Sequence, residues 1–134
     1  MIRAIIFDLD NTLLDFMKMK SSSINAAVLG MISAGMKINK EKSIQEIYNI
    51  YDTKGYEHQE VLNEFIVNNI GKINYKYLAA GIVEYKKAKE VSLNLYDDVI
   101  PTLGKLLDMN LKLGIVSDAP SREAWMRLYT LNLH

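Results

Sequence analysis

The feature that most constrains the fold is an apolar run that ends in two carboxylates. Residues 4–7 read Ala-Ile-Ile-Phe and are followed by Asp8 and then by Asp10. Such a run is typical of a strand that is buried on both faces of a parallel sheet. In open parallel α/β sheets, the carboxyl ends of the strands form the edge where ligands bind. The sequence therefore predicts a strand over residues 3–8 that delivers two acids to a ligand-binding edge.

The composition is that of an ordinary folded domain. Of the 134 residues, 49% are hydrophobic and 24% are charged, and the formal net charge is zero. Without an excess of basic charge, we expect neither nucleic acid nor a membrane surface as a partner. The lack of cysteine excludes a disulfide framework and a thiolate metal site. The first apolar run is broken by Asp8 and is too short for a signal peptide or a membrane span, so we expect a cytoplasmic protein.

A long helical block follows the first strand. After a turn over residues 9–16, the apolar spacing takes the helical period and keeps it over residues 17–91. Asn74 has the character of a helix N-cap. Breaks in the block fall near residues 35–39, 53–55 and 71–74. The spacing therefore predicts about four helices in this block.

An α/β pattern resumes after the helical block. Pro101 suits the first turn of a helix, residues 111–116 form a second apolar run, and Pro120 opens a last helix. Trp125 lies at helical spacing in that last helix and is expected in the core. The order strand, helical insertion, helix, strand, helix is typical of an α/β fold. Its second half forms a crossover that supports a parallel pair of strands.

Asp8 and Asp10 have two interpretations. In the first, Asp10 belongs to an Asx-type turn that only ends the strand. In the second, one carboxylate attacks phosphorus to form an aspartyl-phosphate, while the other donates and accepts the protons. Two acids also attract Mg²⁺, which prefers oxygen ligands and would offset the repulsion between a carboxylate and a phosphate.

Polar residues after the second strand fit the same chemistry. Ser117 and Asp118 are of the types that cap helices, and a helix start with a hydroxyl can also bind an anion. If the two strands are parallel neighbours, Ser117 lies at the same sheet edge as Asp8. Thr12 either supports the turn or orients Asp8. His58 stands in a polar stretch and is expected to be exposed rather than to contact substrate.

Two motifs and their spacing resemble the haloacid dehalogenase (HAD) superfamily. Residues 7–13 resemble its first motif, Asp-x-Asp-x-Thr, and residues 115–118 resemble its second, a Ser or Thr at the end of the second strand. The helical block resembles a cap of the C1 type. The resemblance implies a partial, Rossmann-like α/β core over residues 1–16 and 92–134, with an inserted helical cap over residues 17–91.

The resemblance also implies a role for each motif residue. Asp8 would be the nucleophile and a Mg²⁺ ligand. Asp10 would be the general acid/base and would bind the metal through its backbone carbonyl. The implied phosphate-binding residues are Leu9, Thr12, Ser117 and Asp118. Because the cap selects the substrate in this superfamily, the residues just after the motif are candidates for substrate contact, namely Asp15, Phe16 and Lys18.

The second acid favours phosphoryl chemistry within the superfamily. True dehalogenases lack an acid at the position of Asp10, because a halide leaving group needs no proton. The resemblance therefore implies a Mg²⁺-dependent phosphatase that hydrolyses a phosphate monoester of a small metabolite through an aspartyl-phosphate. Two alternatives stay open. One is a phosphomutase with the same acid pair and a sugar hydroxyl as acceptor, and the other is a non-catalytic helical module that binds a partner.

The chain departs from the family pattern after the second motif. The family places a Lys and then an acidic pair there, whereas Asp118 is followed by no Lys and by one acid, Glu123. Such groups each contribute about 10²–10³ in rate, so we expect impaired turnover. We also expect the sequence to be the N-terminal portion of a longer protein, or another chain to complete its core. Two strands make a poor sheet, and an unpaired edge on the first strand would favour self-association.

Overall fold

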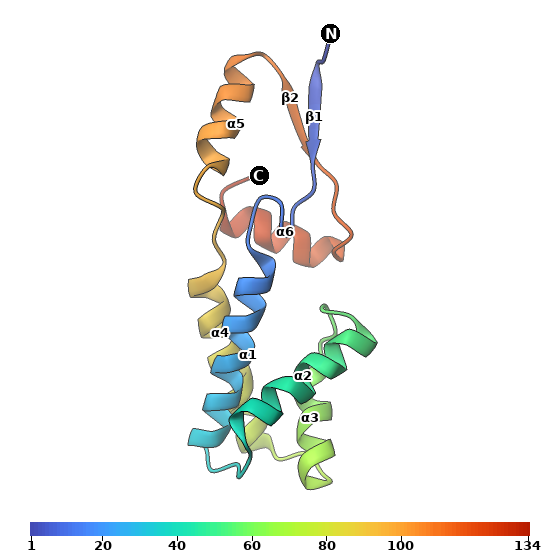
Figure 1. Ribbon diagram of the computed structural model, residues 1–134, viewed down its shortest axis with the longest axis vertical. Helices are drawn as coiled ribbons and strands as arrows, with labels where there is room; N and C mark the ends of the chain where they lie inside the picture. The colour runs from blue at the N-terminus through green and yellow to red at the C-terminus, as the bar shows by residue number, and fades with distance from the viewer. The chain divides into compact units, whose positions relative to one another are not determined.

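The computed structural model describes residues 1–134 and contains two short strands and six helices (Figure 1). In chain order the elements are β1 (Ala4–Phe7), α1 (Phe16–Ser33), α2 (Lys40–Lys54), α3 (Val61–Ile70), α4 (Tyr75–Ser92), α5 (Val99–Asp108), β2 (Lys112–Ile115) and α6 (Ser121–Thr130). They form two compact units. The first unit joins Met1–Met19 to Leu93–His134, and the second is Lys20–Ser92.

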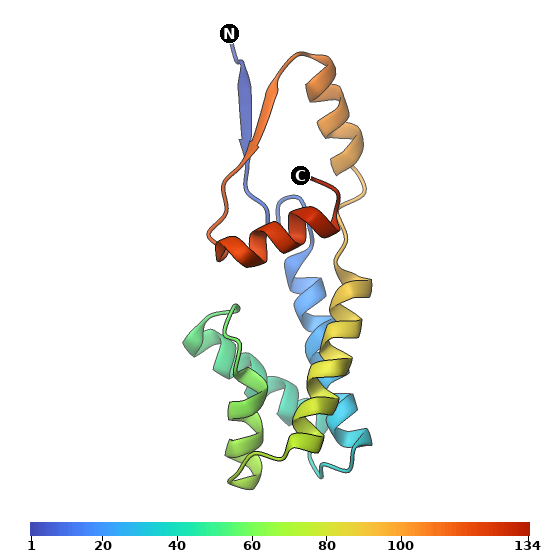
Figure 2. The ribbon, with the colours of Figure 1, turned by 180° about the vertical axis from the view of Figure 1, so that it is seen from behind.

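The first unit is built on a parallel pair of strands. β1 and β2 run side by side with Ala4 opposite Lys112 and Phe7 opposite Ile115 (Figure 2). The helix α5 makes the crossover into β2, and Pro101 lies in its first turn, where a missing N–H costs nothing. The helix α6 follows β2. This arrangement confirms the predicted α/β class and the parallel pairing.

Two expectations about burial in the first unit are wrong. The strand β1 is not buried on both faces, since 68% of Ile6 is exposed in a sheet that has only two strands. Trp125 is not a core residue either, because 62% of it is exposed. It lines an open, mainly apolar groove of about 740 Å³, together with Phe7, Leu103 and Leu128. The sheet face and the inner sides of α5 and α6 form this groove.

The second unit consists of the four predicted helices. Gly35, Gly55 and Gly71 follow α1, α2 and α3, and each has a positive φ that residues with a side chain rarely adopt. The N-cap role of Asn74 is confirmed, because its Oδ1 accepts a hydrogen bond of 3.2 Å from the backbone N–H of Tyr77. Glycine stops and an asparagine cap therefore set the helix ends where the sequence predicted breaks.

A continuous apolar core holds the second unit together. Phe65, Ile66 and Ile47 are completely buried within it, as are Val28 and Met31 of α1. The other buried members are Ile24, Ala27, Met36, Tyr51, Val61, Leu62 and Leu78. These residues come from all four helices, so the unit has a hydrophobic core of its own.

The proposed division into core and cap is close to, but not the same as, the division into compact units. The sequence predicted an insertion over residues 17–91, whereas the second unit runs from Lys20 to Ser92. The assignment of the two units as catalytic core and substrate cap stays a prediction.

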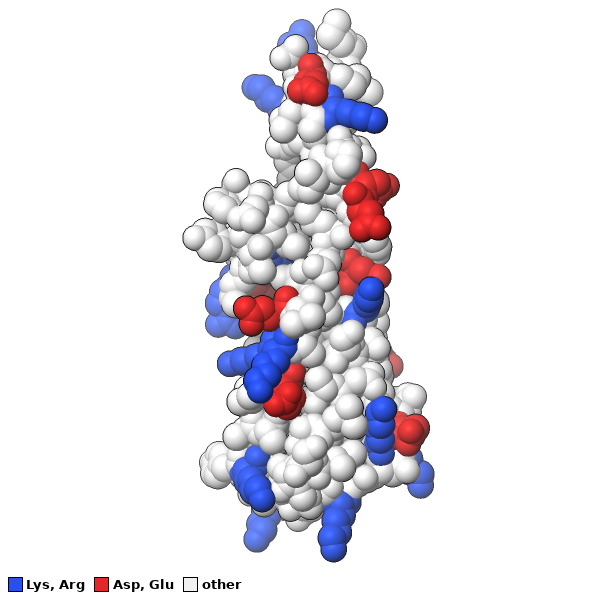
Figure 3. Space-filling view, turned by 90° about the vertical axis from the view of Figure 1, so that its left-hand side faces the viewer, with Lys and Arg blue, Asp and Glu red and all other residues white.

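The surface mixes charges of both signs. Figure 3 shows acidic and basic side chains interspersed over one face, without a broad patch of either sign. None of the helices is both long enough and apolar enough to cross a bilayer.

One close helix contact in the second unit depends on a missing side chain. A Cβ placed on Gly30 of α1 would lie 2.8 Å from Glu84 Cγ and 3.0 Å from the carbonyl oxygen of Ala80, both in α4. The side chain of Glu84 can move, but the backbone carbonyl cannot without shifting the helix. The two helices therefore approach each other closely at Gly30.

We predict opposite effects for two helical Gly→Ala substitutions. Alanine normally favours a helix over glycine by about 1 kcal/mol. Gly104→Ala in α5 should stabilise the protein by up to that amount, because nothing lies within 4 Å of the added Cβ. Gly30→Ala should destabilise it by about 1–3 kcal/mol, the usual range for overpacking. Urea unfolding followed by circular dichroism measures both, and an equal stabilisation by the two variants would contradict the close contact.

Candidate active site

The strand pairing brings the two sequence motifs to one end of the sheet. Beyond the last ladder pair, the backbone N–H of Val116 donates to the carbonyl oxygen of Phe7 over 2.9 Å. The next residues after Phe7 and Val116 are Asp8 and Ser117, so both lie just past the carboxyl ends of β1 and β2. The side chain of Asp8 is exposed there. This is the edge at which parallel α/β sheets bind ligands.

A tight loop after β1 holds the first motif. The carbonyl oxygen of Leu9 accepts from the backbone N–H groups of Thr12 and Leu13 over 3.3 and 2.9 Å. Asn11 has a φ of 60°, a left-handed conformation that asparagine tolerates better than most residues. The side chains of Leu9 and Leu14 are completely buried and anchor the loop. The loop geometry therefore follows from the order of acids, asparagine and leucines in the sequence.

Thr12 reaches back to the first acid. Its Oγ1 donates to Asp8 Oδ2 over 3.3 Å. Of the two predicted roles for Thr12, this contact fits the orientation of Asp8, which it restrains from within the same loop.

Asp10 forms an ion pair that the sequence did not reveal. Arg127 of α6 places its Nη1 2.8 Å from Asp10 Oδ2. The Arg127 side chain is only 3% exposed and that of Asp10 is 21% exposed. The Arg127 guanidinium also lies over the ring of Phe16, 4.9 Å from its centroid. The sequence did offer one signal for this pair. Arg127 lies four residues after Glu123, on the face of α6 that also carries Leu128. Charged residues rarely lie on a buried helix face unless they are paired.

Ser117 and Asp118 do not cap the helix that follows them. The helix α6 begins at Ser121 with Pro120 in the cap position and without a side-chain cap. Ser117 Oγ instead accepts a hydrogen bond of 3.1 Å from the backbone N–H of Ala119, as in a Ser-type turn. The capping interpretation of these residues is therefore wrong. Asp118 is exposed, and the phosphate-binding role of both residues stays a prediction.

Two of the three candidate substrate residues have structural contacts. Asp15 caps α1, since its Oδ1 accepts a hydrogen bond of 3.1 Å from the backbone N–H of Lys18. Phe16 is 94% buried beneath the Arg127 guanidinium, with 6% of its surface exposed. Lys18 is exposed. A role for any of them in substrate contact stays a prediction.

The residues at this edge could hold Mg²⁺ with only a few protein ligands. Among residues 1–134, no group of three or more His, Cys, Asp or Glu side chains lies together as a metal site. Mg²⁺ needs fewer, because it is often held by one or two carboxylates together with water and phosphate oxygens. The exposed carboxylate of Asp8 and the backbone carbonyl of Asp10 are suitable donors. The carboxylate of Asp10 is engaged with Arg127 instead.

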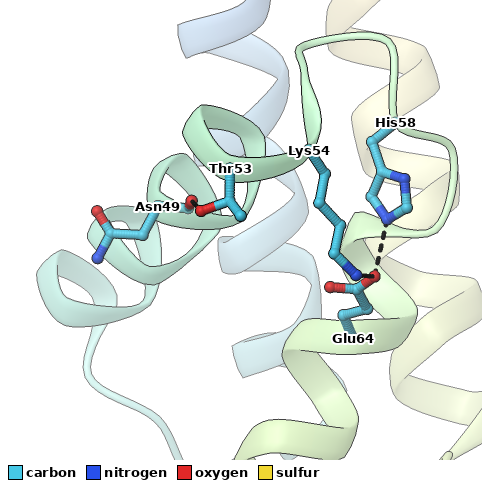
Figure 4. Close-up of polar contacts among 5 residues, drawn as sticks. All are labelled: Asn49, Thr53, Lys54, His58 and Glu64. Atoms are coloured by element: carbon cyan, nitrogen blue, oxygen red, sulfur yellow. Dashed lines mark hydrogen bonds and ion pairs between the residues drawn. The ribbon is translucent and has the colours of Figure 1, made fainter.

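A separate polar cluster lies in the second unit. Lys54, at the end of α2, and His58, in the following loop, both contact Oε1 of Glu64 in α3, with His58 Nε2 at 2.9 Å (Figure 4). His58 was expected to be exposed, but only 23% of its side chain is, because it packs toward this carboxylate. The cluster ties the loop between α2 and α3 to the start of α3.

The fold and the edge geometry together define an α/β protein with an exposed carboxylate just past the carboxyl end of its first strand. The family model described as haloacid dehalogenase-like hydrolase matches residues 5–134. The chain therefore belongs to the haloacid dehalogenase-like hydrolase family.

Relatives with named activities cover the whole chain. It is 32% identical over 134 residues to a glyceraldehyde 3-phosphate phosphatase of Methanocaldococcus jannaschii, with 100% of this chain and 59% of the relative aligned. It is also 32% identical over 137 residues to the protein of the same name from Methanopyrus kandleri, 58% of which is aligned. The chain thus spans somewhat more than half the length of these relatives.

Solved structures share the fold. A "putative beta-phosphoglucomutase" from Thermotoga maritima matches with a TM-score of 0.68 at 21% identity, over 98% of this chain and 57% of that one. The "putative HAD-hydrolase YfnB" from Bacillus subtilis, solved with bound magnesium, matches with a TM-score of 0.55 at 20% identity, over 98% and 59%. At these identities the matches show a common fold.

The Glu64 cluster predicts an acid-dependent contribution to stability. The hydrogen bond from Lys54, and to a smaller extent that from His58, lowers the pKa of Glu64 below its ordinary value. A carboxyl whose pKa is lowered by folding stabilises the fold above its unfolded pKa and loses this effect as the pH falls through the folded value. Glu64→Gln should therefore lower the melting temperature at pH 7, and the gap to the wild type should close as the pH falls below 4.5, the ordinary pKa of the group.

Thermal unfolding between pH 7 and pH 3 tests this prediction, with two neighbouring variants as controls. In Lys54→Met, most of the pH-dependent stabilisation by Glu64 should be lost, because Lys54 lowers the pKa of Glu64 the most. In His58→Gln, a smaller part of it should be lost. A gap between Glu64→Gln and the wild type that stays constant on acidification would show that the cluster does not lower this pKa.

Proposed function

We propose that this chain carries the nucleophile and the acid/base of a Mg²⁺-dependent phosphatase that acts on phosphate monoesters. The observation that carries the proposal is the exposed Asp8 carboxylate at the end of β1, held by Thr12 over 3.3 Å, with Asp10 two residues further around the same loop. Membership of the hydrolase family supports it. So do the relatives that are named phosphatases.

In the first step, a carboxylate oxygen of Asp8 attacks the phosphorus of the ester. The bond between phosphorus and the ester oxygen breaks, and an aspartyl-phosphate forms. Protonated Asp10 gives its proton to the departing oxygen, so that the leaving group departs as a neutral alcohol. Thr12 restrains Asp8 through its hydrogen bond to Oδ2.

In the second step, Asp10 acts in the opposite direction. Its carboxylate takes a proton from a water molecule, and the water oxygen attacks the phosphorus of the aspartyl-phosphate. The bond between Asp8 and phosphorus breaks, which releases phosphate and restores the Asp8 carboxylate. One residue thus serves as acid and then as base, and each step leaves it in the form that the next one needs.

Several groups offset the negative charge at this edge. Mg²⁺ would be held by the Asp8 carboxylate and the Asp10 backbone carbonyl, and it supplies positive charge that lets an anionic nucleophile meet a phosphate. We assign Ser117, with the nearby backbone of residues 9 and 118, to the phosphoryl oxygens. Ser117 follows the strand that pairs with β1, which supports this assignment.

The relatives narrow the substrate class that we propose. Two of those named glyceraldehyde 3-phosphate phosphatases share 32% of their aligned residues with this chain. We therefore propose a small, phosphorylated sugar or sugar-derived metabolite, hydrolysed in the cytoplasm. The fold match to a "putative beta-phosphoglucomutase" keeps the mutase alternative in place, in which a sugar hydroxyl replaces water in the second step.

We predict that hydrolysis depends on Asp8. Asp8→Asn removes the nucleophile while keeping the size of the side chain, and it should lower the rate by about 10³-fold or more. The measurement is release of inorganic phosphate from glyceraldehyde 3-phosphate and of p-nitrophenolate from an aryl phosphate, by the full natural chain with Mg²⁺. Asp108→Asn changes an exposed carboxylate at the end of α5 and should leave the rate unchanged.

Binding of a phosphoryl mimic gives a second readout that does not require turnover. Beryllofluoride with Mg²⁺ should bind the wild type and not Asp8→Asn, as followed by ¹⁹F NMR. Hydrolysis that survives Asp8→Asn would exclude this mechanism. A wild type that neither hydrolyses the esters nor binds the mimic would favour the non-catalytic interaction module instead.

A further inference from the structure

The Arg127–Asp10 ion pair joins the helix after the second motif to the acid of the first. The two residues are 117 positions apart, and Arg127 Nη1 lies 2.8 Å from Asp10 Oδ2. We propose that Arg127 is a positioning residue that fixes the Asp10 carboxylate for proton transfer. This inference rests on the proposed function, because it concerns the same acid/base.

The guanidinium is restrained on two sides. Phe16, which is itself buried, lies under it at 4.9 Å from ring centroid to Cζ. Asp10 Oδ2 accepts a hydrogen bond of 2.8 Å from Arg127 Nη1. Arginine suits such a place because its planar group can stack on a ring and donate in the plane at the same time. The ring and the ion pair together leave the guanidinium little freedom to rotate.

Proton transfer by Asp10 requires its carboxylate to be held in a fixed position. A general acid must come within about 2.6–3.2 Å of the atom that it protonates, and a displacement of about 1 Å can cost about 10²-fold in rate. Asp10 sits in a loop, where a short side chain can rotate about two bonds. With Oδ2 held by Arg127, the carboxylate keeps one orientation in both steps.

The charge of Arg127 favours the carboxylate form of Asp10 and still allows a hydrogen bond to the protonated form. Arginine stays protonated at any pH at which the protein is folded. When Asp10 has given its proton to the leaving oxygen, it becomes a carboxylate that faces this fixed positive charge. When it later accepts a proton from water, the ion pair becomes a hydrogen bond between a charged donor and a neutral acid. The partner therefore does not have to move between the two steps.

Two other roles for Arg127 fit the structure less well. A direct substrate ligand would need an accessible guanidinium, but only 3% of the side chain is exposed. A purely structural ion pair would add little to the free energy of folding, because buried ion pairs often stabilise a protein no more than apolar residues of the same size. Arg122 on the same helix provides a contrast, since it is 74% exposed and pairs with its neighbour Glu123.

Pre-steady-state kinetics with p-nitrophenyl phosphate tests the proposal. The p-nitrophenolate ion leaves without a proton, so misplacement of Asp10 should spare the first step and slow the second. In the full natural chain, Arg127→Met should give a rapid burst of one p-nitrophenolate per active site at close to the wild-type rate. Its steady-state kcat should then fall by about 10²-fold. Arg127→Lys keeps the charge and should recover part of that loss.

Arg122→Met controls for changes to α6 and should behave like the wild type. A kcat for Arg127→Met within twofold of the wild type would overturn the proposal. So would a loss that affects the burst and the steady state equally in both Arg127 variants, as expected from a fold defect. If the wild type shows no hydrolysis that depends on Asp8, the proposed function fails, and this inference fails with it. If the wild type hydrolyses the ester through Asp8 but Arg127→Met leaves kcat unchanged, only the inference about Arg127 fails.

Discussion

The site depends on the parallel register of two four-residue strands. Phe7 pairs with Ile115, and one further hydrogen bond joins Phe7 to Val116, so the residues that follow emerge at the same edge. A shift of one residue would send alternate side chains to the opposite face of the sheet. The crossover through α5 fixes the direction of β2, and with it the edge of the sheet at which Ser117 follows the strand. A short ladder thus determines the geometry of a site whose residues lie far apart in sequence.

Two carboxylates lie close together at this edge, and neighbouring hydrogen-bond donors offset part of their repulsion. Asp8 and Asp10 lie two residues apart in a loop whose anchors, Leu9 and Leu14, are completely buried. Thr12 donates to one acid and Arg127 to the other, so each acid has a donor of its own. The neutral hydroxyl of Thr12 restrains Asp8, the proposed nucleophile, without neutralising it. The permanent cation of Arg127 pairs instead with Asp10, the proposed acid/base, which changes its charge during the proposed reaction.

The sequence was most informative where a local rule decides the structure. Glycines and an asparagine cap predicted the ends of the helices, and the apolar runs predicted two parallel strands. It failed where distant residues decide the outcome. Arg127 reads as one more charge on a helix, and only the fold brings it to Asp10. Trp125 was expected to be buried from its helical spacing and Ile6 from its place in an apolar run, but burial also needs a covering layer. The capping of α6 failed because Pro120 moved the helix start past Ser117 and Asp118.

The exposed residues of the first unit bear on how far the proposed chemistry can proceed. The groove of about 740 Å³ presents Phe7, Leu103 and Trp125, next to a strand edge that no other strand pairs with. The curated relatives are longer, since this chain aligns with 58–59% of their residues. In water, the loop that holds Asp8 works at a high dielectric, where ion pairs and oriented dipoles are weakest. A layer that covered this groove would exclude water from the sheet face that Phe7 and Ser117 line, just before and after the ends of the strands. The rate of the proposed reaction is therefore tied to the burial of the sheet as well as to the acids themselves.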